Sequence, residues 1–322
     1  MGGNRRGYKV NTKTLAHFRT GIGNFIMMTP ALRALASMDP SGKVDICTDV
    51  DWTDSRKDGI LDLWRKLPFV EDVYVMDFSD ASLKMPKPYS VWYYAEWSTH
   101  GAARDFFEKR KPYHKAAWDH SITHETDYYF SAVRDHYGYS GPKPDQAVAC
   151  ANSPTLQLED KKLVCLCNGS FGDTSVAKKW NNFPSLAVEL KNYYGNKIAI
   201  AKIGYNTELS DVGVYDYDFV GKLSFTETCK IIDQCSLIVT TDTGLMHAGD
   251  ALKKNMLVLW GGAALKKNEP IGGTSRVLHL GLKCQPCFRS ERYKECINFS
   301  CMADISVGEV VCNVRRMLDV GN

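Results

Sequence analysis

The segment Thr241-Asp242-Thr243-Gly244-Leu245-Met246-His247 places an acid, hydroxyls, a glycine and an imidazole at one turn. The apolar run before it, residues 237–239, is typical of a buried parallel strand, and a helix is predicted over 248–252. Open α/β sheets bind ligands at the edge where such strands end. Gly244 lets the backbone approach a ligand, and the free N–H groups that open the helix can hold a phosphate. We therefore predict an anion site at Thr241, Asp242, Thr243, Gly244 and His247.

Two of these residues also have a structural interpretation. Asp at a strand-to-helix turn is often a helix N-cap, and Asp242 could serve as one while it also contacts a ligand. His247 could contact phosphates or cap a turn.

A glycine-rich loop with lysines follows another apolar strand, Leu163 to Cys167. Its sequence is Asn-Gly-Ser-Phe-Gly over 168–172 and Ala-Lys-Lys-Trp over 177–180. Gly169, Ser170 and Lys178 are predicted to hold a phosphate. The alternative for Lys178 is a solvated surface lysine, because Lys179 lies beside it.

Four cysteines near the C-terminus have the spacing of metal ligands. Two residues separate Cys284 from Cys287, eight separate Cys287 from Cys296, and four separate Cys296 from Cys301. The first interval is that of a zinc knuckle, so a structural zinc site is one interpretation. Free thiols and a disulfide pair are the others.

An aromatic segment, residues 89–97, contains Trp92 and Glu96, and a basic stretch follows at 109–115. Aromatic faces stack on sugars or bases, and lysines bind phosphates, so this region is a candidate binding site for a phosphorylated sugar or a nucleic acid. The alternative is a buried strand followed by a solvated basic loop.

The chain alternates strand-like and helix-like segments, which predicts doubly wound parallel sheets. Strands are predicted at 14–18, 44–47, 73–76, 90–94, 163–167, 198–203, 237–239 and 256–260, and helices at 24–38, 60–67, 102–109, 184–194, 225–235, 248–252 and 307–318. Gly141-Pro142-Lys143-Pro144 interrupts the alternation and begins the best candidate for a linker, which extends to Asp160.

Composition narrows the class of protein. A length of 322 residues suits two domains. Forty basic and 37 acidic side chains leave a net charge of +3, which does not indicate nucleic-acid binding. No apolar N-terminal segment is long enough for a signal peptide or membrane span, and most of the eleven cysteines lie singly in apolar segments. These features predict a cytoplasmic protein with reduced thiols.

Four segments together resemble the lipopolysaccharide heptosyltransferases of glycosyltransferase family 9. They are residues 21–24 (Gly-Ile-Gly-Asn) with 29–35, the loop with Lys178, the segment 241–247 followed by Gly261-Gly262, and the cysteine-bearing tail at 284–306. Their order along the chain is that of the family, and they extend over nearly all of it.

The resemblance implies the GT-B fold: two doubly wound Rossmann-like domains that face a central cleft. Residues 1–150 would bind the acceptor and 151–305 a nucleotide sugar, while a helix in 306–322 would cross back to the first domain. Lys178 matches the family's phosphate-contacting lysine and Asp242 the acid near the donor sugar. Glu208 would reach the nucleoside, and Ser224 matches a loop near the base, although Glu208 could be a solvated loop residue and Ser224 also starts a capping box with Glu227.

The implied reaction moves a sugar from an ADP- or UDP-linked donor, such as ADP-heptose, to a hydroxyl of a glycolipid or glycan. The acceptor implied is a lipopolysaccharide core, reached at a membrane surface. The resemblance implies catalysis without a metal, and Asp49-Val50-Asp51 and Asp216-Tyr217-Asp218 do not have the context of a metal site. Lys178 and the helix after Gly244 could stabilise the departing diphosphate instead.

The chain departs from the family at Gly23-Asn24, where many heptosyltransferases carry Gly-Asp. That aspartate is the family's candidate general base, and an amide can orient a hydroxyl but cannot take its proton. Asn24 is therefore a candidate acceptor-binding and catalytic residue, and the base could be Asp51, Asp54, Glu96 or Asp242. Two further hypotheses remain: transfer to a hydroxylated nucleobase in DNA, and a nucleotide-sugar-binding protein without catalysis.

Overall fold

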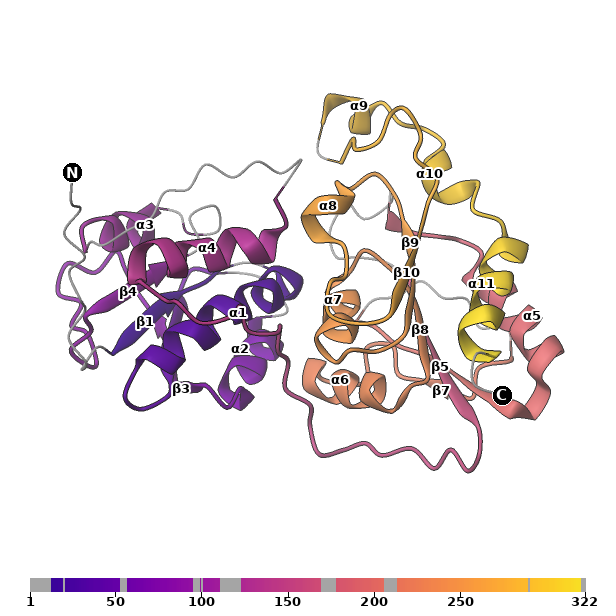
Figure 1. Ribbon diagram of the computed structural model, residues 1–322, viewed down its shortest axis with the longest axis horizontal. Coiled ribbons are helices and arrows are strands. Elements are labelled where there is room, and N and C mark those ends of the chain that lie inside the picture. Colours follow the sequence, from indigo (N-terminus) through magenta and orange to yellow (C-terminus); the bar gives the residue numbers. More distant parts are fainter. Residues whose placement is uncertain are drawn as a thin grey trace. The chain divides into compact units, whose positions relative to one another are not determined.

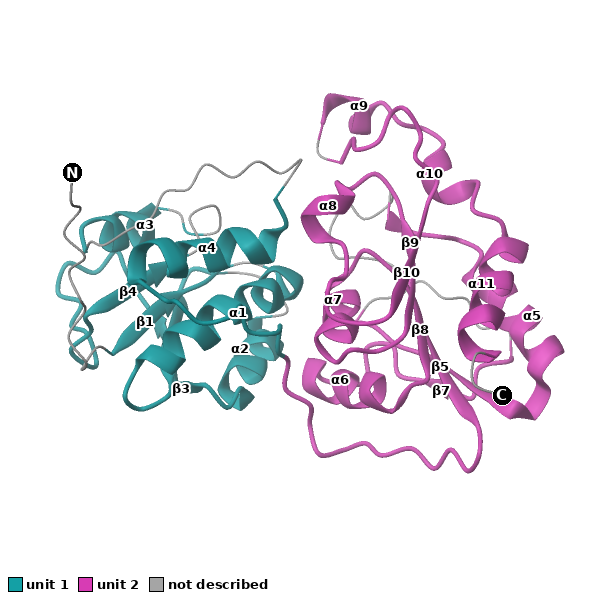
Figure 2. Cartoon of the chain, in the orientation of Figure 1, with its two compact units in different colours: residues 1–119, 123–147 teal, residues 120–122, 148–322 magenta. Residues whose placement is uncertain are grey.

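The computed structural model describes residues 13–19, 21–52, 57–94, 99, 101–110, 123–168, 178–205, 213–288 and 290–319. The chain divides into two compact units (Figure 2), residues 1–119 with 123–147, and residues 120–122 with 148–322. Each unit is built on a parallel sheet (Figure 1).

The first unit has a four-stranded sheet in the order β3-β2-β1-β4, and every paired strand is parallel. Its elements are β1 (Thr14–His17), α1 (Ile22–Met38), β2 (Val44–Asp49), α2 (Lys57–Lys66), β3 (Val70–Met76), β4 (Val91–Tyr94), α3 (Gly101–Glu108) and α4 (Glu125–Tyr137).

Strand β1 shows how this sheet is covered on both faces. Alternate side chains of a strand point to opposite faces. Leu15 packs in one cluster with Phe107 of α3, while Phe18, which directly follows β1, contacts the rings of Phe25 in α1 and Trp64 in α2. All four residues of β1 are buried, as expected for a central parallel strand.

The second unit has a six-stranded parallel sheet in the order β10-β9-β8-β5-β6-β7. Its elements are β5 (Lys162–Cys167), α5 (Phe183–Tyr194), β6 (Ile198–Lys202), β7 (Tyr217–Asp218), α6 (Phe225–Gln234), β8 (Leu237–Thr241), α7 (Gly244–Ala251), β9 (Met256–Trp260), α8 (Leu265–Asn268), β10 (Ser275–His279), α9 (Glu291–Lys294), α10 (Ser300–Ala303) and α11 (Val307–Asp319), with a short 3-10 turn at Gly195–Lys197.

Helices α5 and α11 lie on one side of this sheet, and α6 and α7 lie on the other (Figure 1). Val310, Val314 and Leu318 of α11 are buried in one cluster with Val164 of β5 and Leu190 of α5. The helix packs in the core of the second unit. Its apolar residues recur every four positions, and the α5 side of this sheet covers that stripe.

The topology of the second sheet defines a switch point. Strand β5 pairs with β6 on one side and β8 on the other, so the connections after β5 and β8 lead away in opposite directions. In open α/β sheets the carboxyl ends of two such strands flank the crevice that binds ligands. The residues that follow β5 and β8 are therefore the first to consider as a site.

Candidate functional site

An ion pair links the segments that follow β5 and β8. The Nζ atom of Lys178 lies 2.6 Å from Oδ2 of Asp242, and the two side chains are 13% and 4% exposed. The residues lie 64 positions apart in the chain, and the sheet topology brings them to the switch point. Lys178 is thus a largely buried cation held by Asp242, and the solvated-lysine interpretation is wrong.

The N-cap of α7 is Thr243 and not Asp242. The Thr243 hydroxyl accepts a hydrogen bond from the Met246 N–H at 3.3 Å, and the helix begins at Gly244, four residues before the predicted start. The Asp242 carboxylate is therefore available for Lys178. Thr241 is fully buried at the end of β8, and His247 is 3% exposed in the first turns of α7.

The segment around Lys178 is fixed by its neighbours. The Trp180 backbone N–H donates to Oδ1 of Asn168 at 2.9 Å, and its indole N–H donates to the Ile305 carbonyl at 2.9 Å. The Trp180 ring is fully buried. These bonds set the register of the chain at Lys178, two residues earlier.

The cysteine-bearing tail reaches the same place. The Lys178 Nζ lies 4.6 Å from the centroid of the Phe288 ring, a cation–π contact. The backbone N–H groups of Cys287 and Phe288 both donate to the Gly262 carbonyl at 2.9 Å. A Cβ at Gly262 would lie 2.8 Å from the Cys287 sulfur, so the tail needs a glycine there to pack this closely.

Four more residues were predicted to bind the nucleotide sugar: Gly169, Ser170, Glu208 and Ser224. Ser224 caps α6 in a full capping box with Glu227, which confirms its structural interpretation. Gly169, Ser170 and Glu208 lie outside the described residues.

The four tail cysteines are all free thiols. Cys284 is exposed, while Cys287 and Cys301 are buried. Burial, reinforced by the negative thiolate forms of Cys287, Cys296 and Cys284, raises the pKa of Cys301 to about 11. No three of these four sulfurs lie within 4.8 Å of one another in the described part of the chain.

Among the described residues, only Asp45, Glu71 and Asp72 place three ligand atoms within 4.8 Å of one another. These carboxylates are already paired with Lys13 and Lys87. They lie at the amino ends of β2 and β3, whereas open α/β sheets bind ligands at the carboxyl ends of their strands.

In the first unit, the helix after β1 positions Asn24. The Asn24 Nδ2 donates to Oε1 of Glu125 at 2.6 Å, and the Tyr129 hydroxyl donates to the same oxygen at 2.6 Å. Glu125 is fully buried at the start of α4. Because a carboxylate only accepts hydrogen bonds, the Asn24 amide must direct its nitrogen to Glu125. Its Oδ1 then lies near Gly21, and a Cβ built at Gly21 would be 3.6 Å from that oxygen. Sequence reasoning missed Glu125, which lies in no recognisable motif.

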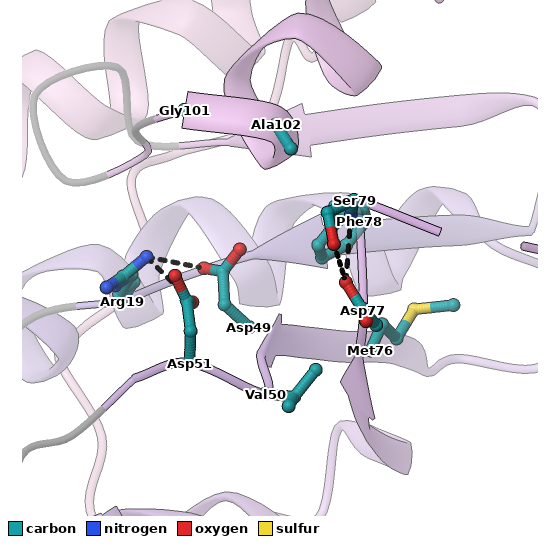
Figure 3. Close-up of a pocket in the computed structure, with 10 residues that line it drawn as sticks. All are labelled: Arg19, Asp49, Val50, Asp51, Met76, Asp77, Phe78, Ser79, Gly101 and Ala102. Atoms are coloured by element: carbon teal, nitrogen blue, oxygen red, sulfur yellow. Dashed lines mark hydrogen bonds and ion pairs between the residues drawn. The ribbon is translucent and has the colours of Figure 1, made fainter. Parts of the chain in front are cut away.

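A pocket of about 420 Å³ opens where the strands of the first sheet end (Figure 3). It is lined by Arg19, Asp49, Val50, Asp51, Met76, Asp77, Phe78, Ser79, Gly101 and Ala102. Arg19 pairs with Asp51 at 3.0 Å and lies 3.7 Å from Asp49. Asp51, a candidate base, lines this pocket, whereas Asp54 and Glu96 lie outside the described residues.

Trp92 belongs to an aromatic cluster. Its ring contacts those of Tyr89, Phe106 and Phe107, and the Arg110 guanidinium lies over it at 5.3 Å. The structure thus supports the strand interpretation of Trp92. Gly23 lies in the first turn of α1, next to Asn24.

Comparisons with known proteins agree with this architecture. Residues 95–298 match the model of glycosyltransferase family 9 (heptosyltransferase). A curated relative, lipooligosaccharide heptosyltransferase 2 of Campylobacter jejuni serotype O:6, is 24% identical over 178 residues, which are 51% of this chain and 54% of the relative. The chain thus spans about half the length of this curated relative.

Two solved structures share the fold. The family 9 glycosyltransferase of Veillonella parvula has a TM-score of 0.75 at 15% identity, with 97% of this chain and 99% of that chain covered. ADP-heptose lps heptosyltransferase II of E. coli has a TM-score of 0.70 at 15% identity, covering 95% and 98%. This likeness confirms the predicted GT-B fold. No helix in the described part of the chain is long and apolar enough to cross a membrane.

Proposed function

Because the chain belongs to glycosyltransferase family 9, we propose that it transfers a sugar from a nucleotide diphosphate to a hydroxyl group. The observation that carries this proposal is the Lys178–Asp242 pair at the switch point of the second sheet. Family membership alone would leave open which residues hold the donor.

Lys178 has the chemistry that the leaving group needs. When the bond between the anomeric carbon and the diphosphate breaks, negative charge grows on the departing oxygens, and a fixed cation stabilises it. Lys178 is held by Asp242 and Phe288, so little reorganisation is needed. The N-terminus of α7, which starts at Gly244, adds N–H donors beside the same pair.

The donor proposed is an ADP-linked heptose. The curated relative is named a heptosyltransferase, and the E. coli structure is described as an ADP-heptose enzyme. The acceptor proposed is a hydroxyl of a lipooligosaccharide core, as in the name of the relative. In this assignment the second unit binds the donor and the first unit the acceptor.

The experiment that tests the proposal is a transfer assay with ADP-heptose and a de-O-acylated lipooligosaccharide core. Release of ADP and a mass increase of one heptose on the core support it. ADP binding without transfer to any core would favour the non-catalytic hypothesis. The DNA hypothesis relied on the basic stretch 109–115. In the described structure Arg110 packs on Trp92 and Phe106, and residues 111–115 lie outside the described part, so no described feature supports a DNA acceptor.

The tail cysteines are proposed to hold a structural zinc ion. Thiolate sulfur is a soft ligand that suits zinc, and the spacing of Cys284 and Cys287 is that of a zinc knuckle. No three of the four sulfurs lie within 4.8 Å of one another in the described structure, so zinc binding would have to draw them together. Zinc there would brace the tail that carries Phe288. Metal content near one zinc per chain, lost in Cys287→Ser, supports this site, and a metal-free protein with full activity contradicts it. Metal independence of the transfer and the cytoplasmic location stay predictions.

A further inference from the structure

We propose that the pocket at the carboxyl edge of the first sheet binds a hydroxyl-rich sugar, and that Asp49 there accepts the proton of the attacking hydroxyl. The proposal rests on the function proposed above and identifies a residue for its acceptor half. His17 would act as the positioning residue for Asp49.

The pocket is formed by segments that are far apart in the chain. Arg19 follows β1, Asp49 ends β2, Asp77 follows β3, and Gly101 opens α3 (Figure 3). Its volume of about 420 Å³ lies within the range of about 300–1,000 Å³ that is usual for small-molecule sites. A parallel sheet presents its ligand-binding side chains at this edge.

A chain of buried hydrogen bonds orients the Asp49 side chain. The His17 Nε2 lies 2.9 Å from Oδ2 of Asp49, and the Nδ1 lies 2.9 Å from Oγ1 of Thr99. His17 and Thr99 are both fully buried. The tautomer of His17 that donates from Nε2 to the carboxylate accepts from the Thr99 hydroxyl at Nδ1, and it satisfies every member of the chain.

The second oxygen of Asp49 is the one left for a ligand. Asp49 is 5% exposed, and its Oδ1 makes no hydrogen bond or ion pair with any residue in the described part of the chain. Figure 3 shows one Asp49 oxygen toward Arg19 and the other turned away from it, toward the space below Ala102. This oxygen faces the cavity, where the hydroxyl of a ligand can donate a hydrogen bond to it.

The charges of the pocket favour a neutral, hydroxyl-bearing ligand. Three carboxylates, those of Asp49, Asp51 and Asp77, line it together with one cation, Arg19. Carboxylates accept from sugar hydroxyls and repel phosphates. The phosphates of a glycolipid core would therefore lie outside this pocket.

The chemical step balances with no further reactant. The O–H bond of the acceptor breaks and its proton passes to Oδ1 of Asp49. The electron pair left on the acceptor oxygen forms a bond to the anomeric carbon of the donor. The bond from that carbon to the diphosphate breaks, and its electron pair leaves with the nucleoside diphosphate.

Asp49→Asn tests the proposal, because it keeps the size of the side chain and removes its basicity. With ADP-heptose and the de-O-acylated core, we expect kcat to fall at least about 100-fold while ADP binds with unchanged affinity. Asp62→Asn, an acid on the surface of α2, is the matched control and should keep full activity. Activity of Asp49→Asn within threefold of wild type would overturn the role of Asp49.

His17→Gln tests the positioning role. The Gln side chain is expected to orient the Asp49 carboxylate less well, so kcat should fall about 10- to 100-fold while the KM for the core stays unchanged. An unchanged kcat would reduce His17 to a packing residue.

A binding measurement separates this site from the proposed function. Methyl heptoside is titrated into isotope-labelled protein, and the His17 and Ala102 signals are followed by NMR. Their perturbation supports the pocket even if no transfer is found, a result that would count against the proposed function alone. Perturbation of neither signal would overturn the pocket as a sugar site.

Discussion

The Asn24 amide and the buried Glu125 carboxylate meet at 2.6 Å, although 101 positions separate them in the chain. This bond fixes which way the Asn24 amide faces, and it places a buried carboxylate beside residue 24. A second acid at residue 24 would therefore have to share its site with Glu125.

Asn24→Asp is expected to destabilise the first unit by about 1–3 kcal/mol, because two carboxylates would replace a hydrogen-bonded pair. Mutual repulsion raises the pKa of one of them above its unfolded value, so the folded state binds the extra proton. The penalty should thus be small near pH 4 and grow as the pH rises to 8. Urea denaturation at several pH values measures it.

The double variant Asn24→Asp/Glu125→Gln exchanges the two groups and restores one donor and one acceptor. It should recover most of the lost stability and remove the pH dependence. Equal stability of the single and double variants at pH 8 would show that the Asn24–Glu125 contact does not matter.

Lys178 and Asp242 are expected to be strongly coupled. Lys178→Met leaves a carboxylate that is 4% exposed without its cation, which costs about 3–5 kcal/mol of unfolding free energy. Lys178→Met/Asp242→Asn should recover much of this loss, and a double-mutant cycle gives a coupling of about 1–3 kcal/mol. The exposed pair Lys66–Asp62, at 42% and 38%, is the control and should couple by less than about 1 kcal/mol. Coupling as weak in the first cycle as in the second would contradict a buried ion pair.

Thr243→Ala removes the cap of α7 and is expected to cost about 1 kcal/mol of stability. Asp242→Asn should leave helix content unchanged, since Asp242 does not cap the helix. Thermal unfolding followed by circular dichroism compares the two. A larger loss of helix in Asp242→Asn than in Thr243→Ala would show that Asp242 is the N-cap of α7.

Gly262→Ala is expected to displace the cysteine-bearing tail, because the new Cβ would lie 2.8 Å from the Cys287 sulfur. We expect a loss of about 1–3 kcal/mol and weaker ADP binding, since the displaced Phe288 no longer supports Lys178. Gly308→Ala in α11 is the control, as nothing lies within 4 Å of its Cβ, and it should lose no stability. Equal behaviour of the two variants would show that the close approach is not required.

Much of the fold follows from the sequence because buried parallel strands give continuous apolar runs, as at β5, β8 and β9. Strand β10 was missed because an edge strand is only partly buried, and β7 because it has two residues. The start of α7 was placed too late because the Gly-Leu-Met-His turn lacks a helical pattern, and only the Thr243 bond shows where the helix begins.

The candidate site was predictable only where a motif carries it. Lys178 and Asp242 lie in recognisable motifs, but their pairing depends on the strand order. Glu125 and the His17–Asp49 pair lie in no motif, and only the packing of α4 on α1 and of β2 beside β1 brings them together.

The most direct test of the account is a calorimetric titration of ADP into wild type, Lys178→Met/Asp242→Asn and Lys179→Met. We expect the wild type and Lys179→Met to bind ADP alike, and the Lys178 variant to bind about 10- to 150-fold more weakly, the scale of one charge-assisted hydrogen bond of about 1.5–3 kcal/mol. Unchanged affinity in the Lys178 variant would contradict the central claim that this ion pair marks the donor site.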